Sequence, residues 1–184
     1  GYVLPAIENQ ILKSATVLAA AGAEFCIVPD NLLQFGIHLA EGRSPIPFLT
    51  MTDLVGEAIA ADGRKNVGLI GTKLVMLGST YQTFLGLRGV RVEIPTPEES
   101  DELNAIIFRE LLFGIVQAQS QRRVLDLLKS LADRGCEGVI LGCSEAALIV
   151  TGENSPLPVY DTTWLLAEGA VRCSLGERAI GRAT

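Results

Sequence analysis

Asp30 and Cys143 are the side chains whose types and positions could perform acid–base chemistry on a small molecule. Each stands at the end of one copy of a duplicated stretch, because residues 11–31 align without a gap with residues 124–144. A carboxylate and a thiolate can each remove a proton, and their conjugate acids can return one. Two half-domains related by pseudo-symmetry would place the pair across one cleft. An acid or base on each side of a substrate is what inversion of a carbon centre requires.

A second match extends the repeat. Residues 44–55 align with residues 155–166, and Gly22 of the first stretch matches Gly135 of the second. The first copy lacks the counterpart of residues 65–113, about 49 positions. We expect a complete protein to carry that much more at its N-terminus, including a first strand, because a parallel sheet without a central strand would expose the neighbouring strands. A first half that is simply shorter is the alternative.

The position of Cys143 favours a reactive thiol. It follows a predicted strand and a glycine, so backbone N–H groups at the start of the next helix are expected to lower the thiol pKa below its ordinary value of about 8.5. The alternative is a buried structural cysteine. Asp30 also has two interpretations, a base opposite Cys143 or the N-cap of the helix that follows it. The repeat leaves both interpretations of Asp30 open.

Four neighbouring residues are candidates for contact with a substrate. Asn31 and Ser144 are equivalent in the repeat and could donate hydrogen bonds to a substrate carboxylate, or could be plain turn and cap residues. Thr72 follows an apolar run, where its hydroxyl and backbone N–H could hold an anion or cap a helix. Glu145 could orient Cys143, or could only add a favourable charge to a first helical turn.

The elements that must position these residues indicate an α/β fold. Short unbroken apolar runs, typical of parallel strands covered on both faces, alternate with helical patterns. One amphipathic pattern spans residues 124–131 and stops before Gly135, and another spans residues 103–115 behind an acidic start. The predicted strands are residues 24–28, 46–49, 66–70, 90–94, 138–141 and 157–160.

Composition argues against several classes of function. The chain has 184 residues, 48% of them hydrophobic, and a net charge of −6. It has no basic cluster to attract nucleic acid or an anionic membrane, and no apolar run long enough to span one. A single histidine and four cysteines without a CxxC spacing argue against a metal site. We interpret Cys26, Cys136 and Cys173 as small hydrophobic residues, and we expect a reducing, cytoplasmic location.

The segment GVILGCSE at residues 138–145 resembles the strand and Gly-Cys-Thr-Glu turn of the aspartate/glutamate racemase superfamily, whose enzymes work without PLP. AGAEFCIVPDN at residues 21–31, GLIGTK at 68–73 and PVYDTT at 158–163 support the resemblance, which covers nearly the whole chain. It implies two pseudo-symmetric, flavodoxin-like parallel-sheet lobes with the site in the cleft between them. It also implies a homodimer, no cofactor, and two opposed cysteine bases beside carboxylate-binding Asn and Thr residues.

The two lobes are expected to divide the chain unequally. Residues 1–63 plus 163–184 are predicted to form the N-terminal lobe, without its first strand. Residues 64–162 are predicted to form the C-terminal lobe.

The chain departs from the racemase pattern around the first reactive position. Asp-Asn-Leu at residues 30–32 stands where the family has Cys-Asn-Thr, and Gln34 stands where a histidine is frequent. In a later loop, Val75 and Leu77 replace positions that are commonly polar. The pocket is therefore expected to be more apolar than one built for a second substrate carboxylate. Ordinary two-thiol racemisation is not expected, and Cys143 is the one catalytic residue that matches the motif.

Three hypotheses for the function follow. The first is a cofactor-independent amino-acid racemase or epimerase, an isomerase in which Cys143 and Asp30 exchange the α-proton on opposite faces while Asn31, Thr72 and Ser144 stabilise the developing negative charge. The second keeps the fold but uses Cys143 alone, in a decarboxylase or a cis–trans isomerase. The third is a catalytically silent protein that binds a small carboxylate.

Overall fold

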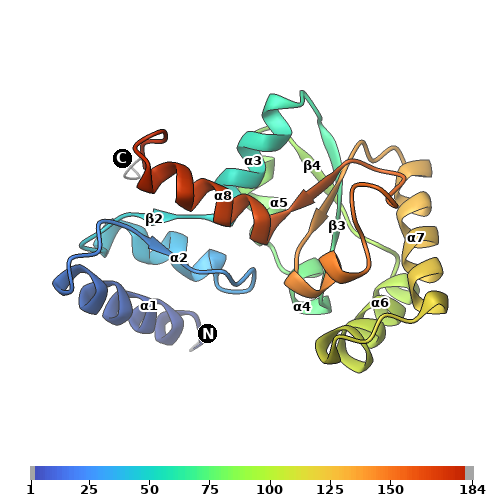
Figure 1. Ribbon diagram of the computed structural model, residues 1–184, viewed down its shortest axis with the longest axis horizontal. Coiled ribbons are helices and arrows are strands. Elements are labelled where there is room, and N and C mark those ends of the chain that lie inside the picture. Colours follow the sequence, from blue (N-terminus) through green and yellow to red (C-terminus); the bar gives the residue numbers. More distant parts are fainter. Residues whose placement is uncertain (1–2, 181–184) are drawn as a thin grey trace.

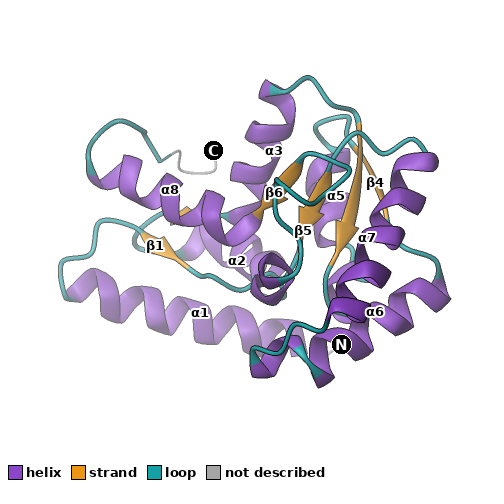
Figure 2. Ribbon diagram, turned by 45° about the vertical axis from the view of Figure 1, so that its right-hand side comes forward, coloured by secondary structure: helices purple, strands orange, loops and turns teal. Residues whose placement is uncertain are grey.

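The structure, a computed structural model, describes residues 3–180 and has the predicted α/β fold (Figures 1 and 2). Within these residues every strand pairing is parallel, in a two-stranded sheet of order β1-β2 and a four-stranded sheet of order β4-β3-β5-β6. The predicted strands are all confirmed, most of them shorter than expected. They are β1 Cys26–Ile27, β2 Phe48–Leu49, β3 Asn66–Ile70, β4 Arg91–Glu93, β5 Val139–Leu141 and β6 Val159–Asp161.

Helices cover both faces of the four-stranded sheet, as its unbroken apolar strands predict. Leu69 of β3 packs in a core cluster with residues of α3 and α5, whereas Ile70, one position on, packs with residues of α6 and α7. The helices are α1 Val3–Ala20, α2 Gln34–Ala40, α3 Met51–Ala61, α4 Lys73–Met76, α5 Thr80–Gly86, α6 Pro97–Arg109, α7 Ala118–Asp133 and α8 Thr162–Ser174, with 3-10 turns η1 Glu41–Arg43, η2 Leu111–Phe113 and η3 Ser144–Leu148.

The amphipathic pattern of residues 124–131 is confirmed as the buried face of α7, which ends at Asp133 just before Gly135. The pattern of residues 103–115 was extended too far. α6 ends at Arg109 because the backbone of Glu110 leaves the helical region, with φ −125° and ψ −66°. Beyond it the chain forms η2, and Ile115 lies outside any helix with 48% of its surface exposed.

The sequence repeat corresponds to a structural repeat with the same strand register. Cys26 of β1 pairs with Phe48 of β2, and the equivalent Val139 of β5 pairs with Val159 of β6. The two strands of each pair therefore meet at the same point in both copies. This match makes the loops that follow β1 and β5, and so Asp30 and Cys143, equivalent in space as well as in sequence.

Two local details repeat as well. Gly22 and Gly135, which precede β1 and β5, have φ values of +91° and +89°, a left-handed conformation that favours glycine. Ser44 and Ser155 each donate a hydrogen bond from Oγ to the carbonyl oxygen two residues further on, at 2.6 Å in both cases. Such turns fix how the chain enters each strand, so they set the strand ends at which the site is built.

The helix that follows each copy of the repeat packs against the other half of the molecule. α8, drawn in red in Figure 1, runs from the end of β6 back towards β2, and its Leu166 packs with Leu49 and Met51. Val55 of α3 packs in turn with Leu69 of β3. The predicted boundaries of the two lobes stay a prediction, since α3 contacts both sheets.

No helix among residues 3–180 combines the length and the apolar character needed to cross a membrane.

Candidate active site

One cavity, with a volume of about 180 Å³, is lined by all six residues that the sequence proposed for catalysis or substrate contact. It lies beyond the carboxyl ends of β1, β3, β5 and β6, where parallel α/β sheets place their ligands. The structure thus gives these residues a common location, and their roles stay predictions. The lining residues are Pro29, Asp30, Asn31, Leu32, Thr72, Val75, Gly142, Cys143, Ser144, Glu145 and Thr163.

Two glycines allow the ends of β3 and β5 to meet at the floor of this cavity. A β-carbon on Gly71 would lie 3.1 Å from the carbonyl carbon and oxygen of Gly142. A β-carbon on Gly142 would lie 2.9 Å from side-chain carbons of Leu69 and Val75. Larger residues would push the strands apart, so this close approach fixes Cys143 relative to the rest of the cavity wall.

Cys143 directly follows Gly142 and is 8% exposed. Burial raises its pKa to about 11, and this effect outweighs the backbone N–H of Ala146, which favours the thiolate. Glu145 raises the pKa further through its nearby charge. The predicted lowering of the pKa of Cys143 was therefore wrong, because desolvation by the surrounding core exceeds what the amides at the start of η3 supply.

Asp30 forms a turn cap in the wall of the cavity. Its Oδ1 accepts hydrogen bonds from the backbone N–H groups of Leu32 at 2.7 Å and Leu33 at 3.2 Å. These bonds fix the turn that precedes α2. The N-cap of α2 is Leu33, so Asp30 caps this turn and is not the helix N-cap that one interpretation predicted. No hydrogen bond within residues 3–180 uses the second carboxylate oxygen, Oδ2. One oxygen of Asp30 therefore supports the loop, while the other is available to a ligand.

Gln34 holds this loop from beneath. It is fully buried, and its Nε2 donates to the carbonyl oxygens of Val28 at 3.0 Å and Asp30 at 2.9 Å. Its Oε1 accepts from the backbone N–H of Met51, the first residue of α3, at 2.9 Å. The sequence indicated Gln34 only as a replacement for a frequent histidine, because none of these partners can be identified from local spacing.

Asn31 is buried between the two halves of the molecule. The Tyr81 hydroxyl donates to its Oδ1, and its Nδ2 donates to Thr162 Oγ1 at 3.1 Å. Thr162 Oγ1 donates in turn to the carbonyl oxygen of Leu141, the last residue of β5, at 2.8 Å. The sequence did not single out Tyr81 as a residue of the site. The available signal was general, since a buried tyrosine hydroxyl needs a hydrogen-bond partner.

Thr72 presents a buried hydroxyl without a partner. It stands at the N-cap position of α4, yet its side chain makes no capping hydrogen bond, and Oγ1 is buried and unsatisfied. The cap interpretation is therefore confirmed for the position of Thr72, although its hydroxyl makes no capping hydrogen bond. A buried polar group left unpaired is costly, and a ligand oxygen in the cavity would satisfy it. Of the remaining candidates, Ser144 is exposed and Glu145 is half-buried in η3.

The cavity carries negative charge. Asp30 and Glu145 are its charged lining residues, and none of the side chains that line it is Lys, Arg or His. The nearest lysine in sequence, Lys73, pairs with Asp101. Because its charged side chains are carboxylates, the cavity favours a ligand that carries an ammonium group as well as a carboxylate. Among the described residues no cluster of three or more His, Cys, Asp or Glu side chains could hold a metal ion.

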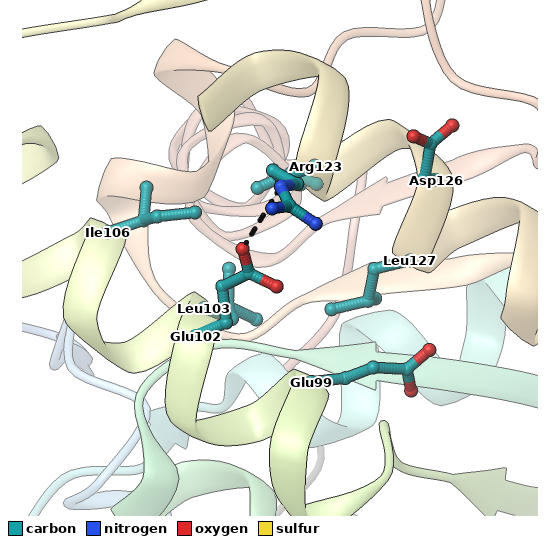
Figure 3. Close-up of a pocket in the computed structure, with 8 residues that line it drawn as sticks. Glu99, Glu102, Leu103, Ile106, Arg123, Asp126 and Leu127 are labelled. Carbon is teal, nitrogen blue, oxygen red and sulfur yellow. Dashed lines mark ion pairs between the residues drawn. The ribbon is translucent and has the colours of Figure 1, made fainter. Parts of the chain in front are cut away.

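A separate hollow between α6 and α7 lacks these features (Figure 3). It has a volume of about 220 Å³ and is lined by Glu99, Glu102, Asp126 and Arg123 together with aliphatic residues. Glu102 and Arg123 point towards one another and form an ion pair at 3.3 Å. Among the described residues no thiol or hydroxyl lines this hollow, so it lacks the combination of a thiol with a carboxylate that the cavity at the strand ends contains.

Fold and site together define a class: a parallel α/β protein with an internal repeat, whose equivalent strand ends place a thiol and a carboxylate in one small cavity. A family model of the Asp/Glu/Hydantoin racemases matches residues 4–170. The chain belongs to this family.

Solved structures agree with this membership. A candidate Asp/Glu racemase from Yersinia pestis is 29% identical, with a TM-score of 0.88 over 94% of this chain and 75% of that one. An aspartate racemase homologue from Pyrococcus horikoshii is also 29% identical, with a TM-score of 0.85 over 91% of this chain and 74% of that one. The aspartate racemase of Picrophilus torridus, at 19% identity, has a TM-score of 0.67 over 91% of this chain and 69% of that one, and so shares the fold.

Proposed function

We propose that this protein is a cofactor-independent amino-acid racemase or epimerase in which Cys143 and Asp30 act on opposite faces of the α-carbon. The observation that carries the proposal is the equivalence of the two residues in the repeat together with their common cavity. A volume of about 180 Å³ is small beside the roughly 300–1,000 Å³ of pockets for drug-sized ligands. It suits a substrate with few heavy atoms.

The protonation state of Cys143 assigns the first roles. With a pKa raised to about 11, its thiol is protonated at neutral pH and is ready to give a proton. Asp30 Oδ2 then takes the α-proton from one face, and the Cys143 thiol delivers a proton to the other. The product leaves behind a protonated Asp30 and a Cys143 thiolate. Proton exchange with water, or a turnover of the opposite enantiomer, restores the starting state.

The other polar groups of the cavity suit an amino acid. The unpartnered Thr72 hydroxyl can donate to the substrate carboxylate, where negative charge grows as the α-proton leaves. The carboxylate of Glu145 offers a partner for the substrate ammonium group. Asn31 takes part through the loop it anchors, because Tyr81 and Thr162 already contact its amide. A homodimer stays a prediction, which sedimentation of the purified protein tests.

One observation favours a second function. Oδ1 of Asp30 accepts two backbone hydrogen bonds within its own turn, as in a structural cap. The thiol of Cys143 is protonated at neutral pH because its pKa is raised. In a decarboxylase, the Cys143 thiol alone would protonate the carbanion from one face. In a cis–trans isomerase, the Cys143 sulfur would instead add to the double bond as a nucleophile and leave again after rotation. The negative charge of the cavity weighs against this alternative for a malonate-like substrate, because two substrate carboxylates would face Asp30 and Glu145.

The test is α-proton exchange in deuterated water, followed by NMR with a panel of L- and D-amino acids. We expect exchange with the wild-type protein, no exchange with Cys143→Ala, and a loss of at least about 100-fold with Asp30→Asn. Cys173→Ala, which changes a thiol outside the cavity, is the control and should keep full exchange.

Three results would point elsewhere. Exchange that survives Cys143→Ala rules out this mechanism. Retention of activity in Asp30→Asn with one-sided stereochemistry supports the single-cysteine enzyme. Binding of amino acids without exchange or turnover identifies a silent binding protein.

A further inference from the structure

A second cavity opens directly beside the first. It has a volume of about 260 Å³, and it shares Asn31, Leu32 and Val75 with the wall of the candidate active site. The two cavities thus meet at the loop after β1 and at α4. The lining residues of the second cavity are Leu4, Asn31, Leu32, Phe35, Leu74, Val75, Gly78, Ser79 and Thr80.

The walls of this second cavity are mainly apolar. Leu32 and Leu74 leave 47% and 71% of their surface exposed around it, while Val75 is nearly buried at 7%. Among the described residues none that lines this cavity carries a charge, and the polar side chains are those of Asn31, Ser79 and Thr80. Exposed leucines gathered at the mouth of a cavity provide a surface suited to contact with an apolar group.

The charge of a substrate side chain decides whether the second cavity can accommodate it. A substrate with a second carboxylate, such as aspartate or glutamate, would bring that group beside Asp30 and Glu145 or into the uncharged second cavity. Within residues 3–180 neither cavity has a cationic lining residue to pair with that carboxylate. An aliphatic side chain needs no partner, and it would bury against Leu32 and Val75.

We propose that the second cavity is the side-chain subsite of this protein and that it takes an uncharged, aliphatic side chain of three carbons or more. The substrate class is then a non-acidic α-amino acid, in contrast to the acidic substrates in the names of the related racemases. This inference rests on the proposed function for the position of the α-carbon. The preference for an aliphatic over a charged side chain is measured by ligand affinity, which does not require turnover.

The experiment compares three ligands on the wild-type protein by isothermal titration calorimetry. Norleucine carries an aliphatic chain, glutamate a charged one, and glutamine a neutral polar one of nearly the same size as that of glutamate. We expect norleucine to bind at least about tenfold more tightly than glutamate, with glutamine between them. Equal or tighter binding of glutamate overturns the inference, and so does the absence of binding by all three ligands.

A charge added to the shared wall sharpens the test. Leu32→Arg places a cation where both cavities meet, so glutamate should gain at least about tenfold in affinity relative to norleucine. Leu77→Arg is the matched control, because Leu77 is 64% exposed and lines neither cavity. An equal shift in both variants would overturn the assignment of this wall to the subsite.

The proposed function and this inference fail in different ways. Preferred binding of norleucine without α-proton exchange by any amino acid supports the subsite and contradicts the racemase. Exchange confined to aspartate and glutamate supports the racemase and contradicts the subsite.

Discussion

The hydroxyl of Tyr81 donates a hydrogen bond to Oδ1 of Asn31, at 2.5 Å and across 50 residues of sequence. Tyr81 lies in α5 beside the four-stranded sheet, and Asn31 lies in the loop after β1 of the smaller sheet. Both side chains are buried, and burial raises the pKa of Tyr81 well above its ordinary value. This one hydrogen bond ties the Asp30 side of the cavity to the half of the molecule that carries Cys143.

Loss of the Tyr81 hydroxyl should loosen that tie. In Tyr81→Phe the buried Asn31 Oδ1 loses its partner, so we expect unfolding to require about 1–3 kcal/mol less free energy, measured by urea denaturation. Ligand affinity and α-proton exchange should both fall, since Asp30 is then less firmly placed. Tyr160→Phe is the control, because its hydroxyl contacts Asp62 and Arg64 outside the cavity. A similar loss of ligand affinity in Tyr160→Phe would contradict a specific role for Tyr81.

The raised pKa of Cys143 makes stability depend on pH in the alkaline range. The pKa of the thiol is about 8.5–9 in an unfolded chain and about 11 in the folded protein. The unfolded chain therefore loses this proton first, and stability falls as the pH rises from about 9 to about 11. The contribution of Cys143 is on the order of 2–3 kcal/mol, fully present below pH 9.

The measurement is the difference in unfolding free energy between the wild type and Cys143→Ala across that pH range. The variant should lack this part of the alkaline fall, which the difference separates from other groups that titrate there. A difference that stays constant from pH 8 to pH 11 would contradict a raised pKa.

Gly142→Ala should disrupt both stability and catalysis. The added β-carbon would lie 2.9 Å from Leu69 and Val75 and 3.0 Å from the carbonyl oxygen of Ile70, so β3 and β5 must separate. Overpacking of this kind costs about 1–3 kcal/mol, and Cys143 shifts with its strand. Gly152→Ala, with no heavy atom within 4 Å of its added β-carbon, is the control. Normal exchange in a folded Gly142→Ala variant would show that the close approach does not position Cys143.

Gln34→Leu should affect the Asp30 side of the site. The change leaves two carbonyl oxygens and one backbone N–H without the partner that Gln34 supplies. We expect a loss of about 1–3 kcal/mol in thermal or urea unfolding. Exchange should fall, while Cys143 keeps the slow alkylation at pH 8 that a raised pKa implies. Fast alkylation of Cys143 in this variant would mean that the change spreads through the whole cavity.

Much of the fold could be predicted because its determinants are local in sequence. Unbroken apolar runs located every described strand, and Gly135 marked where α7 ends. The repeat located the loops that carry Asp30 and Cys143, because the two copies align with each other and place the two residues at equivalent strand ends. It could not say whether Asp30 acts as a base or as a cap, and the structure adds that Oδ1 has the capping role.

The remainder depends on tertiary contacts. The sequence placed Cys143 near backbone amides, but the burial that raises its pKa comes from residues far along the chain. The contacts of Tyr81 with Asn31 and of Gln34 with Met51 join distant segments, so no spacing rule reveals them. The apolar Val75 lines the pocket as predicted, whereas Leu77 is exposed and lines neither cavity.

The exchange of helices between the two halves has a consequence for unfolding. Leu54 of α3 lies against Gly169 of α8, where an added β-carbon would come within 2.9 Å of it, and each helix completes the core of the opposite sheet. Neither half can unfold without exposing part of the hydrophobic core of the other half. The repeat therefore behaves as one cooperative unit, and the cavity between its copies lasts as long as the whole fold does.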